Sequence, residues 1–344
     1  MKFQYIIIFT TLLLTSCGNK ERFEFYGNTL EVDIPEHIEV LKGNQLELDG
    51  LYSGLMYAYD GIIFFRFFDY PEEGIYLYDT ETGKLINTIC KRGNGPNEVI
   101  SVDFDHCVER DSNGIAFWFH DFNRDNLMLV NLQGKYLKKI NTTKFDPDKM
   151  CFSRVFILND SLLISYKQFY EVFENSFIAP SNRIYNYRSG KMLKEFKFYS
   201  DYRINEGEPY WSLHSSNRIK PDKSKIAMPM QYLNYINIFD IESGKIKSIK
   251  PKGAHGLDFI LSGKQVGRYY GDICCDDHYI YVLMEAFGKL TGMIHVFDWE
   301  GNFTHILQIN KDFQYFAFDP VRKVLYAKNE YDEITYYDVK FLYK

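Results

Sequence analysis

Charged and aromatic side chains that suit ligand binding are concentrated in the longer loops of this chain. The candidate binding residues are Arg92, Glu98, Arg154, Tyr170, Trp211, His214, His255, Arg268 and Tyr270. Guanidinium groups, carboxylates and aromatic faces together suit carbohydrates, peptides or the surface of another protein. The alternative is that the aromatic residues, such as Trp211 and Tyr270, only pack the loops onto the scaffold beneath them.

Signatures of catalysis are mostly missing from the sequence. It contains no G-x-S-x-G, H-E-x-x-H or P-loop motif. Glu206 and Glu208 could form the carboxylate pair of a glycosidase, but their spacing in one loop is a poor predictor of the required separation of about 5–9 Å. The histidines are scattered singly, without the spacing of metal ligands. We therefore expect no catalytic residues, metal or cofactor, and keep a hydrolase or lyase acting on a carbohydrate or another small substrate as the alternative.

The first residues have the pattern of an export signal. Lys2 supplies positive charge, and the mostly apolar run from Tyr5 to Leu14 is too short to cross roughly 30 Å of hydrocarbon as a helix. Leu14-Thr15-Ser16-Cys17 resembles the bacterial lipobox, which implies cleavage before Cys17 and lipidation of its thiol with acyl chains such as palmitate. We expect a signal peptide over residues 1–16 and a lipid anchor and tether over 17–28. An ordinary secretory peptide cut nearby is the alternative.

The remaining cysteines are Cys90, Cys107, Cys151, Cys274 and Cys275. An odd number without regular spacing is not a disulfide framework. We expect buried thiols that act as small apolar side chains, with a bridge between Cys90 and Cys107 as the alternative.

The rest of the chain repeats one pattern. An alternating strand, a polar turn ending in glycine and a second strand recur every 51 to 57 residues, with the glycines at Gly83, Gly134, Gly190, Gly244 and Gly301. A second hairpin precedes each of these, and a sixth, degenerate copy follows. Four strands in each of six copies predict an all-β fold, a six-bladed β-propeller of four-stranded antiparallel blades over residues 29–344. The blades are expected near residues 50–90, 101–141, 151–198, 214–250, 271–309 and 313–344. An irregular β-sandwich is the alternative.

Three segments carry a resemblance to a known family. Asp121–Leu127 is similar to a segment of NHL blades, Lys220–Ala227 is similar to the S-P-D-G turn of TolB-type blades, and Lys91–Glu98 resembles a G-x-G-x-G-P-x-E loop. The chain therefore looks like the TolB-like/NHL-like six-bladed propeller lipoproteins common in Bacteroidetes. The resemblance implies architecture and leaves the chemistry open, because such folds host many functions.

The N-terminal stretch has to close the ring. Thr29–Ile34 and Gln45–Asp49 both alternate as strands do. The last blade has a stunted outer strand, and a ring must not leave a sheet edge open. We expect Thr29–Ile34 to complete the last blade.

One face of the predicted propeller carries the long loops. The turns between strands one and two and strands three and four of each blade are tight, and we call their side the turn face. The other connections form the loop face, where the long insertions lie: 90–101, 142–152, 166–182, 198–217, 250–272 and 286–292. Binding usually resides in long loops on a rigid scaffold, so we expect the loop face to be functional.

The charge composition and the predicted export signal limit the kinds of partner that the protein can bind. With 40 Lys and Arg against 46 Asp and Glu, the net charge of −6 gives no sign of nucleic-acid binding. We expect a non-enzymatic lipoprotein of the cell envelope, held in the outer membrane through its N-terminal lipid on the periplasmic or cell-surface side. Its loop face should bind a protein partner or a glycan.

Replacing Cys17 with alanine tests the lipid anchor. The variant should move from the detergent phase to the soluble or uncleaved pool, because the acylated thiol is lost. Phase partitioning and metabolic labelling with a fatty-acid analogue measure this. Label retained by the alanine variant would contradict the prediction.

Overall fold

The structure is a computed structural model that describes residues 24–50, 54–66, 74–95, 97–111, 114–143, 154–167, 176–177, 180–200, 202–203, 213–256, 267–286, 289–309 and 313–344. The following sequence predictions lie outside these residues: the signal peptide, Cys17, Cys151, Tyr170, Trp211 and the Glu206/Glu208 pair.

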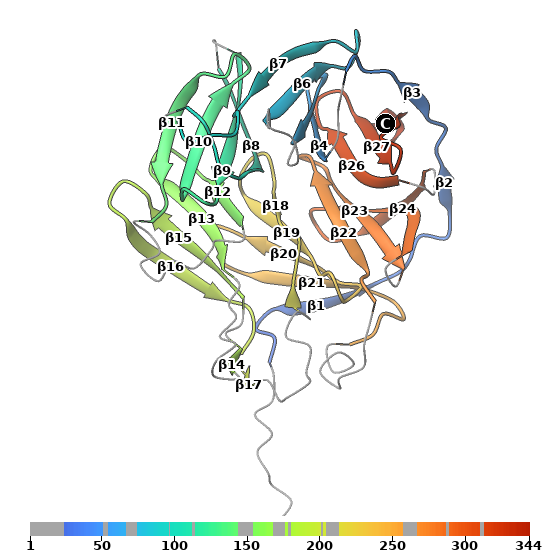
Figure 1. Cartoon of the computed structure of the whole chain (residues 1–344). Coiled ribbons are helices and arrows are strands. Elements are labelled where there is room, and N and C mark those ends of the chain that lie inside the picture. The colour runs from blue at the N-terminus through green and yellow to red at the C-terminus, as the bar shows by residue number, and fades with distance from the viewer. Residues whose placement is uncertain are drawn as a thin grey trace, which may run out of the picture.

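Six four-stranded antiparallel sheets form a ring of blades around a central channel, which confirms the predicted six-bladed propeller (Figure 1). Blade 1 contains β4 (Leu55–Tyr59), β5 (Ile62–Arg66), β6 (Ile75–Asp79) and β7 (Leu85–Ile89). Blade 2 contains β8 (Val102–Asp111), β9 (Gly114–Asp121), β10 (Asn126–Asn131) and β11 (Tyr136–Asn141). Blade 3 contains β12 (Arg154–Ile157), β13 (Leu162–Lys167), β15 (Ser181–Asn186) and β16 (Lys191–Lys197).

The second half of the ring repeats this order. Blade 4 contains β18 (Arg218–Ile219), β19 (Lys225–Pro229), β20 (Ile236–Asp240) and β21 (Ile246–Pro251). Blade 5 contains β22 (Tyr270–Cys275), β23 (Tyr279–Ala286), β24 (Lys289–Asp298) and β25 (Phe303–Gln308). Blade 6 contains β26 (Phe313–Asp319), β27 (Val324–Asn329), β28 (Ile334–Asp338) and β3 (Asn44–Leu46). A separate two-stranded sheet pairs β14 (Ser176–Phe177) with β17 (Tyr202–Arg203).

The repeated turn between strands three and four has a local cause. In blade 1 the Asp79 carboxylate accepts a hydrogen bond of 2.7 Å from the backbone N–H of Thr82, and Gly83 follows with φ of 69°. A positive φ is readily adopted only by glycine. The same carboxylate or amide acceptor begins the corresponding turns at Asn131, Asn186, Asp240 and Asp298. These side chains fix each turn without help from neighbouring blades, so the repeat is visible in the sequence.

The core lies between the faces of neighbouring blades. Blades 1 and 2 meet through Phe64, whose ring lies 5.1 Å from that of Phe104 and 5.0 Å from that of Phe117. All three side chains are buried. The high aromatic content thus fills the wedge-shaped gaps between blades, where large rings contribute most.

The N-terminal segment forms a belt along the outer edges of blades 4, 5 and 6, seen as the blue strands in Figure 1. Strand β1 (Asn28–Val32) pairs in parallel with β21, and β2 (Ile38–Val40) pairs in parallel with β25. Strand β3 then pairs antiparallel with β28 and completes blade 6. The predicted closing strand, Thr29–Ile34, is therefore wrong: the segment is a strand, but it extends blade 4. The alternation of apolar and polar residues identified both N-terminal strands. Only β3, which comes just before β4 in the chain, lies next to blade 6 in the ring.

The junction between blades 6 and 1 is held by a carboxylate. Asp319, fully buried at the end of β26, accepts hydrogen bonds from the backbone N–H groups of Asp60 (2.9 Å) and Gly61 (2.6 Å) in blade 1. It also accepts bonds from the amides of Val321 and Arg322 in its own turn. Gly61 has φ of 77°, and a Cβ at this position would meet the Arg322 guanidinium. This contact fastens the first hairpin of the ring to the last blade.

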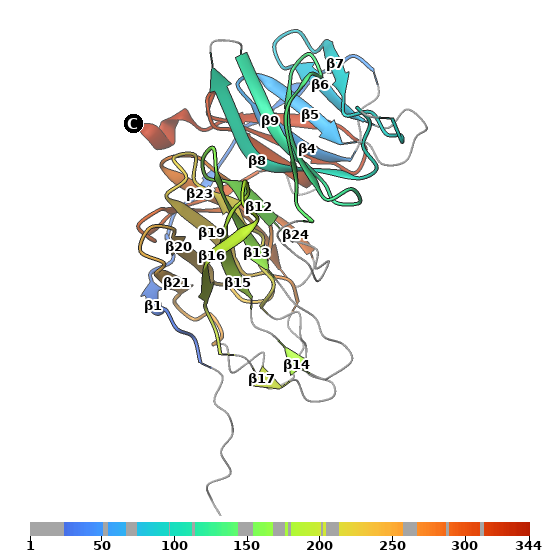
Figure 2. The same cartoon turned by 90° about the vertical axis from the view of Figure 1, so that its left-hand side faces the viewer.

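The C-terminus packs on the turn face beyond blade 6 (Figure 2). The short helix η2 (Lys340–Tyr343) brings the Tyr343 hydroxyl to the Asp276 carboxylate, which also binds Lys323 at 2.7 Å. The Tyr279 hydroxyl donates to the carbonyl of Leu342 at 2.9 Å. These contacts join blades 5 and 6 on the side opposite the loops. Across the described ranges, no helix is long and apolar enough to cross a membrane.

Aspartate substitutions at Leu46 and Leu30 test which strand closes the ring. Leu46 is 7% exposed in β3, whereas Leu30 is 43% exposed in β1. Leu46→Asp should lower the free energy of unfolding by about 3 kcal/mol, because it buries a carboxylate without a partner. Leu30→Asp should cost less than about 1 kcal/mol. Denaturant unfolding compares the two, and a larger loss at Leu30 would contradict closure by β3.

Candidate functional site

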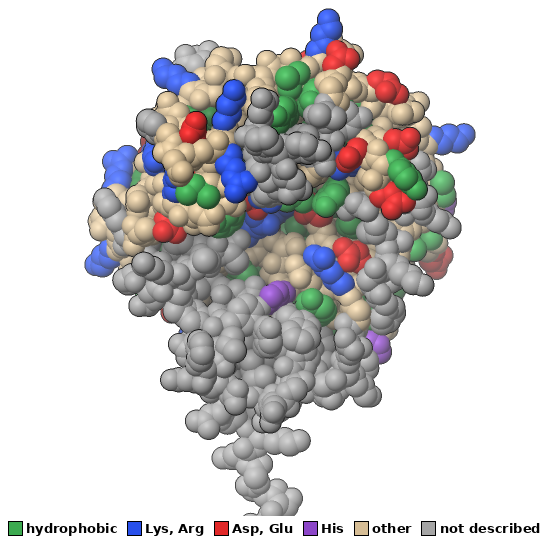
Figure 3. Space-filling model, in the orientation of Figure 1, with side chains coloured by type: hydrophobic (Ala, Val, Ile, Leu, Met, Phe, Trp, Pro, Cys, Tyr) green, Lys and Arg blue, Asp and Glu red, His purple; other side chains and the backbone are tan. Residues whose placement is uncertain are grey.

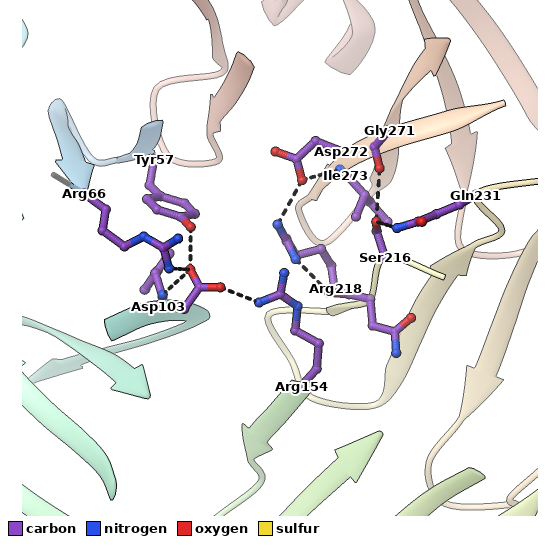
Figure 4. Close-up of polar contacts among 12 residues, drawn as sticks. Tyr57, Arg66, Asp103, Arg154, Ser216, Arg218, Gln231, Gly271, Asp272 and Ile273 are labelled. Carbon is purple, nitrogen blue, oxygen red and sulfur yellow. Dashed lines mark hydrogen bonds and ion pairs between the residues drawn. The ribbon is translucent and has the colours of Figure 1, made fainter. Parts of the chain in front are cut away.

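Charged side chains from five consecutive blades converge near the loop-face end of the channel (Figure 4). This central charged cluster consists of Tyr57, Arg66, Asp103, Arg154, Arg218 and Asp272. The innermost strand of each blade starts at the loop face and ends at the turn face. Asp103, Arg154 and Arg218 are the first or second residues of their inner strands, so they lie near the loop face. Figure 3 looks onto this face and shows a central hollow that contains basic and acidic side chains.

Asp103 is the centre of the first half of the cluster. It is 8% exposed, and its carboxylate binds Arg154 at 2.8 Å and Arg66 at 3.0 Å. The Tyr57 hydroxyl donates a further hydrogen bond of 2.7 Å. Burial by itself raises the pKa of Asp103, but Arg154 and Arg66 outweigh it and hold that pKa below its usual value. Burial and the neighbouring Asp103 carboxylate raise the pKa of Tyr57 well above its usual range.

Arg218 and Asp272 form the second half. The Arg218 Nη2 lies 3.0 Å from Asp272 Oδ1, and Nη1 donates to the carbonyl of Asn217 at 2.9 Å. Arg218 is 4% exposed, whereas the Asp272 side chain is 37% exposed. Among the described residues, the cluster thus contains three guanidinium groups and two carboxylates. Charges that leave water at this depth need such partners.

The structure brings one predicted binding residue, Arg154, into this cluster. Arg268 lies elsewhere on the same side of the ring, where its Nε is 3.8 Å from a Glu285 carboxylate oxygen. Arg92 and His255 are exposed. His214 is half-buried, and burial lowers its pKa to about 4, so the imidazole is neutral at pH 7.

Tyr270 and Glu98 contribute to the scaffold. Tyr270 is buried, and its hydroxyl donates to Asn234 Oδ1 at 2.5 Å, which supports the packing alternative that the sequence left open. Glu98 accepts a hydrogen bond of 2.7 Å from the N–H of Gly95 within its own loop. The Arg124 guanidinium donates to the carbonyls of Glu98 (2.5 Å) and Gly93 (2.7 Å) and holds this loop from blade 2.

Sequence reasoning missed Tyr57, Arg66, Asp103, Arg218 and Asp272. Tyr57, Arg66 and Asp272 lie within or at the end of strands whose other residues are mostly apolar, whereas Asp103 and Arg218 have polar neighbours in the sequence. A charged residue inside such a run indicates a buried partner, and this was the available signal. The partners themselves come from blades far apart in the sequence, so pairing could not be inferred.

Three of the four described thiols are buried, as expected, and Cys275 is half-buried. Cys90, Cys107, Cys274 and Cys275 are free, so the alternative bridge between Cys90 and Cys107 is wrong. Burial raises the pKa of Cys90 to about 12, which keeps it as a thiol. No group of three or more His, Cys, Asp or Glu side chains within the described part of the chain is arranged to hold a metal ion.

Comparison with known proteins shows the fold. No family model matches the chain, and no curated protein matches its sequence. A member of the DUF4221 family from Bacteroides vulgatus is 13% identical with a TM-score of 0.56, over 92% of this chain and 97% of that chain. A Bacteroides fragilis protein named "Putative exported protein" is 13% identical with a TM-score of 0.54, over 90% of this chain and 99% of that chain. The shared fold is the propeller, and the TolB-like/NHL-like resemblance stays a prediction.

An asparagine at position 103 tests the electrostatics of the cluster. Asp103→Asn should lower the free energy of unfolding by about 3 kcal/mol at pH 7, because Arg66 and Arg154 lose their counter-charge. The pKa of Asp103 is lowered in the folded state, so its contribution is present above an unfolded pKa of about 4 and is lost as pH falls through the folded pKa. The difference between variant and parent should therefore shrink below about pH 4.

Asp79→Asn is the matched control, because asparagine occupies the equivalent turn position in blades 2 and 3. It should cost less than about 1 kcal/mol at pH 7. Thermal melts from pH 3 to pH 8 measure both variants. A pH-independent loss for Asp103→Asn would contradict a charge-based role.

Proposed function

We propose that the chain is an exported lipoprotein that binds an acidic glycan on its loop face and recognises a carboxylate of that glycan at the central charged cluster. The observation that carries the proposal is the group of three guanidinium groups and two carboxylates that the described residues bring together near the loop-face end of the channel. Arginine presents a planar fork that matches a carboxylate. Asp103 and the Tyr57 hydroxyl can take part in hydrogen bonds with sugar hydroxyl groups.

The recessed position of the cluster favours a glycan over a flat protein surface. Asp103 and Arg218 are both more than nine-tenths buried. A narrow chain of sugars can reach groups at this depth, whereas a flat protein surface would meet the surrounding rim first. A protein partner remains an outcome of the experiment below.

Fixed ionisation favours binding over proton transfer. The pKa of Asp103 is lowered and that of Tyr57 is raised, so neither changes its charge near pH 7. Burial lowers the pKa of the neighbouring His120 to about 4. Acid–base catalysis works best with a group whose pKa lies near the working pH. This pattern supports a binding protein rather than the hydrolase or lyase alternative.

Export and anchoring rest on the N-terminal sequence. Lys2, the apolar run and Cys17 form the pattern of a lipoprotein signal. The name of the Bacteroides fragilis neighbour, which describes that protein as exported, agrees with this assignment. We place the propeller on the periplasmic or cell-surface side of the outer membrane.

Binding to an oligouronate and to its carboxyl-reduced, neutral counterpart tests the function. The parent protein should bind the acidic oligosaccharide at least tenfold more tightly. Arg154→Gln should weaken that binding about tenfold or more, since truncating one buried charged contact costs about 2 kcal/mol. Arg188→Gln, on an exposed turn of the same blade that faces the other side, is the matched control and should bind like the parent.

Titration calorimetry, with thermal melts of every variant, gives the answer. Equal affinity for the two oligosaccharides, or unchanged binding by Arg154→Gln, would contradict the proposal. A pull-down of the lipidated protein from its own membranes is the second readout. If it recovers a protein in an Arg154-dependent way, the partner is a protein. Release of new sugar ends from the oligouronate would indicate the enzyme alternative.

A further inference from the structure

A cavity of about 120 Å³ lies inside the channel. Its walls come from the inner strands of blades 1, 2, 4, 5 and 6. Tyr57, Arg218 and Asp272 of the central charged cluster line it, and none of its described lining residues lies in a connection of the loop face. The described lining residues beyond the Arg218–Asp272 ion pair extend along the inner strands to the turn face.

The cavity opens at the turn face. Its rim includes Lys220, Pro221 and Lys223 from the first turn of blade 4 and Pro320 from the corresponding turn of blade 6. These residues belong to the tight turns of the turn face. The turns are short, but their prolines and lysines surround the mouth of the channel.

The walls combine an apolar body with a charged end. Phe104, Ile219, Cys274 and Phe318 supply buried apolar surface. The charged groups that line the cavity are Arg218, Lys220 and Lys223 against Asp272. On the rim, Lys220 is paired with Asp222 at 2.5 Å. Lys223 has no carboxylate partner among the residues that the structure describes.

Arg218 has unused donors at this position. Its Nη1 and Nη2 each donate one hydrogen bond, but the buried Nε has no partner in the described part of the chain. Each terminal nitrogen of a guanidinium carries two hydrogens, so Nη2 retains a second one. The Nε–Nη2 edge can therefore hold both oxygens of a carboxylate. A buried donor without an acceptor is costly, and a ligand oxygen would remove that cost.

We propose that this cavity binds a small organic carboxylate whose apolar body is about the size of one six-membered ring. The size follows from the volume, since a cavity of about 150 Å³ holds benzene in another protein. Arg218 anchors the carboxylate and the aromatic walls hold the body. The site shares Arg218 with the central charged cluster but opens on the opposite face, and Arg154 is not among its lining residues.

Titration calorimetry with benzoate, benzamide and benzamidine tests the site in the full chain. Benzoate should bind with one-to-one stoichiometry. The neutral benzamide and the cationic benzamidine, which have the same ring, should bind at least tenfold more weakly. Acetate, which lacks the apolar body, should also bind at least tenfold more weakly than benzoate.

Two variants separate the anchor from the walls. Arg218→Lys keeps a charge beside Asp272 but loses the planar fork, so benzoate affinity should fall at least tenfold. Ala317→Leu fills space in the wall of the cavity without changing a charge and should also abolish binding. Arg154→Gln, on the loop-face side, is the control and should bind benzoate like the parent.

Thermal melts show whether each variant is folded. No benzoate binding by the folded parent protein would overturn the proposal, as would equal affinity for benzoate and benzamide. If folded Arg218→Lys binds benzoate with unchanged affinity, Arg218 does not anchor the carboxylate. If the parent protein binds benzoate but not the oligouronate, the proposed glycan function is contradicted and the cavity site is not.

Discussion

The architecture depends on one junction, where the two ends of the propeller sequence meet in blade 6. Strand β3 supplies the outer strand of that blade, and the Asp319 carboxylate holds the first hairpin of blade 1 against its inner strand. Without this junction the ring would expose the edge of β28 and the inner face of blade 1. The channel exists only because the circumference is closed. Tyr57 of blade 1 and Arg218 of blade 4 line one cavity because closure brings these blades to a common axis.

The channel is divided by charge into two environments. On the loop-face side, Asp103 joins two guanidinium groups and remains ionised. On the turn-face side, aromatic walls and lysines surround a cavity. Arg218 belongs to both, because Asp272 takes only part of its donor capacity. A single buried guanidinium thus links two surfaces that face away from each other.

The sequence predicted what is local and failed where contacts are distant. Turns such as Asp79–Gly83 are fixed by their own hydrogen bonds, so the repeat and the number of blades could be predicted. The closing strand could not, because two N-terminal segments alternate equally well and pairing depends on the geometry of the ring. Arg154 was identified as a charged residue near a loop. Asp103 and Arg218 were missed because their partners, Arg66 and Asp272, lie in other blades that are far apart in the sequence.

The belt of β1, β2 and β3 also determines how the protein responds to mechanical load. Among the described contacts, a pull on the N-terminal end first reaches the hydrogen bond from the N–H of Ser200 to the carbonyl of Glu24, and then the bond from the N–H of Tyr26 to the carbonyl of Phe198, both at 2.8 Å. It next meets the parallel pairing of β1 with β21 and of β2 with β25. Only after these have separated does tension reach β3. The pairings of these two supplementary strands therefore have to separate one after the other before tension reaches the strand that completes blade 6.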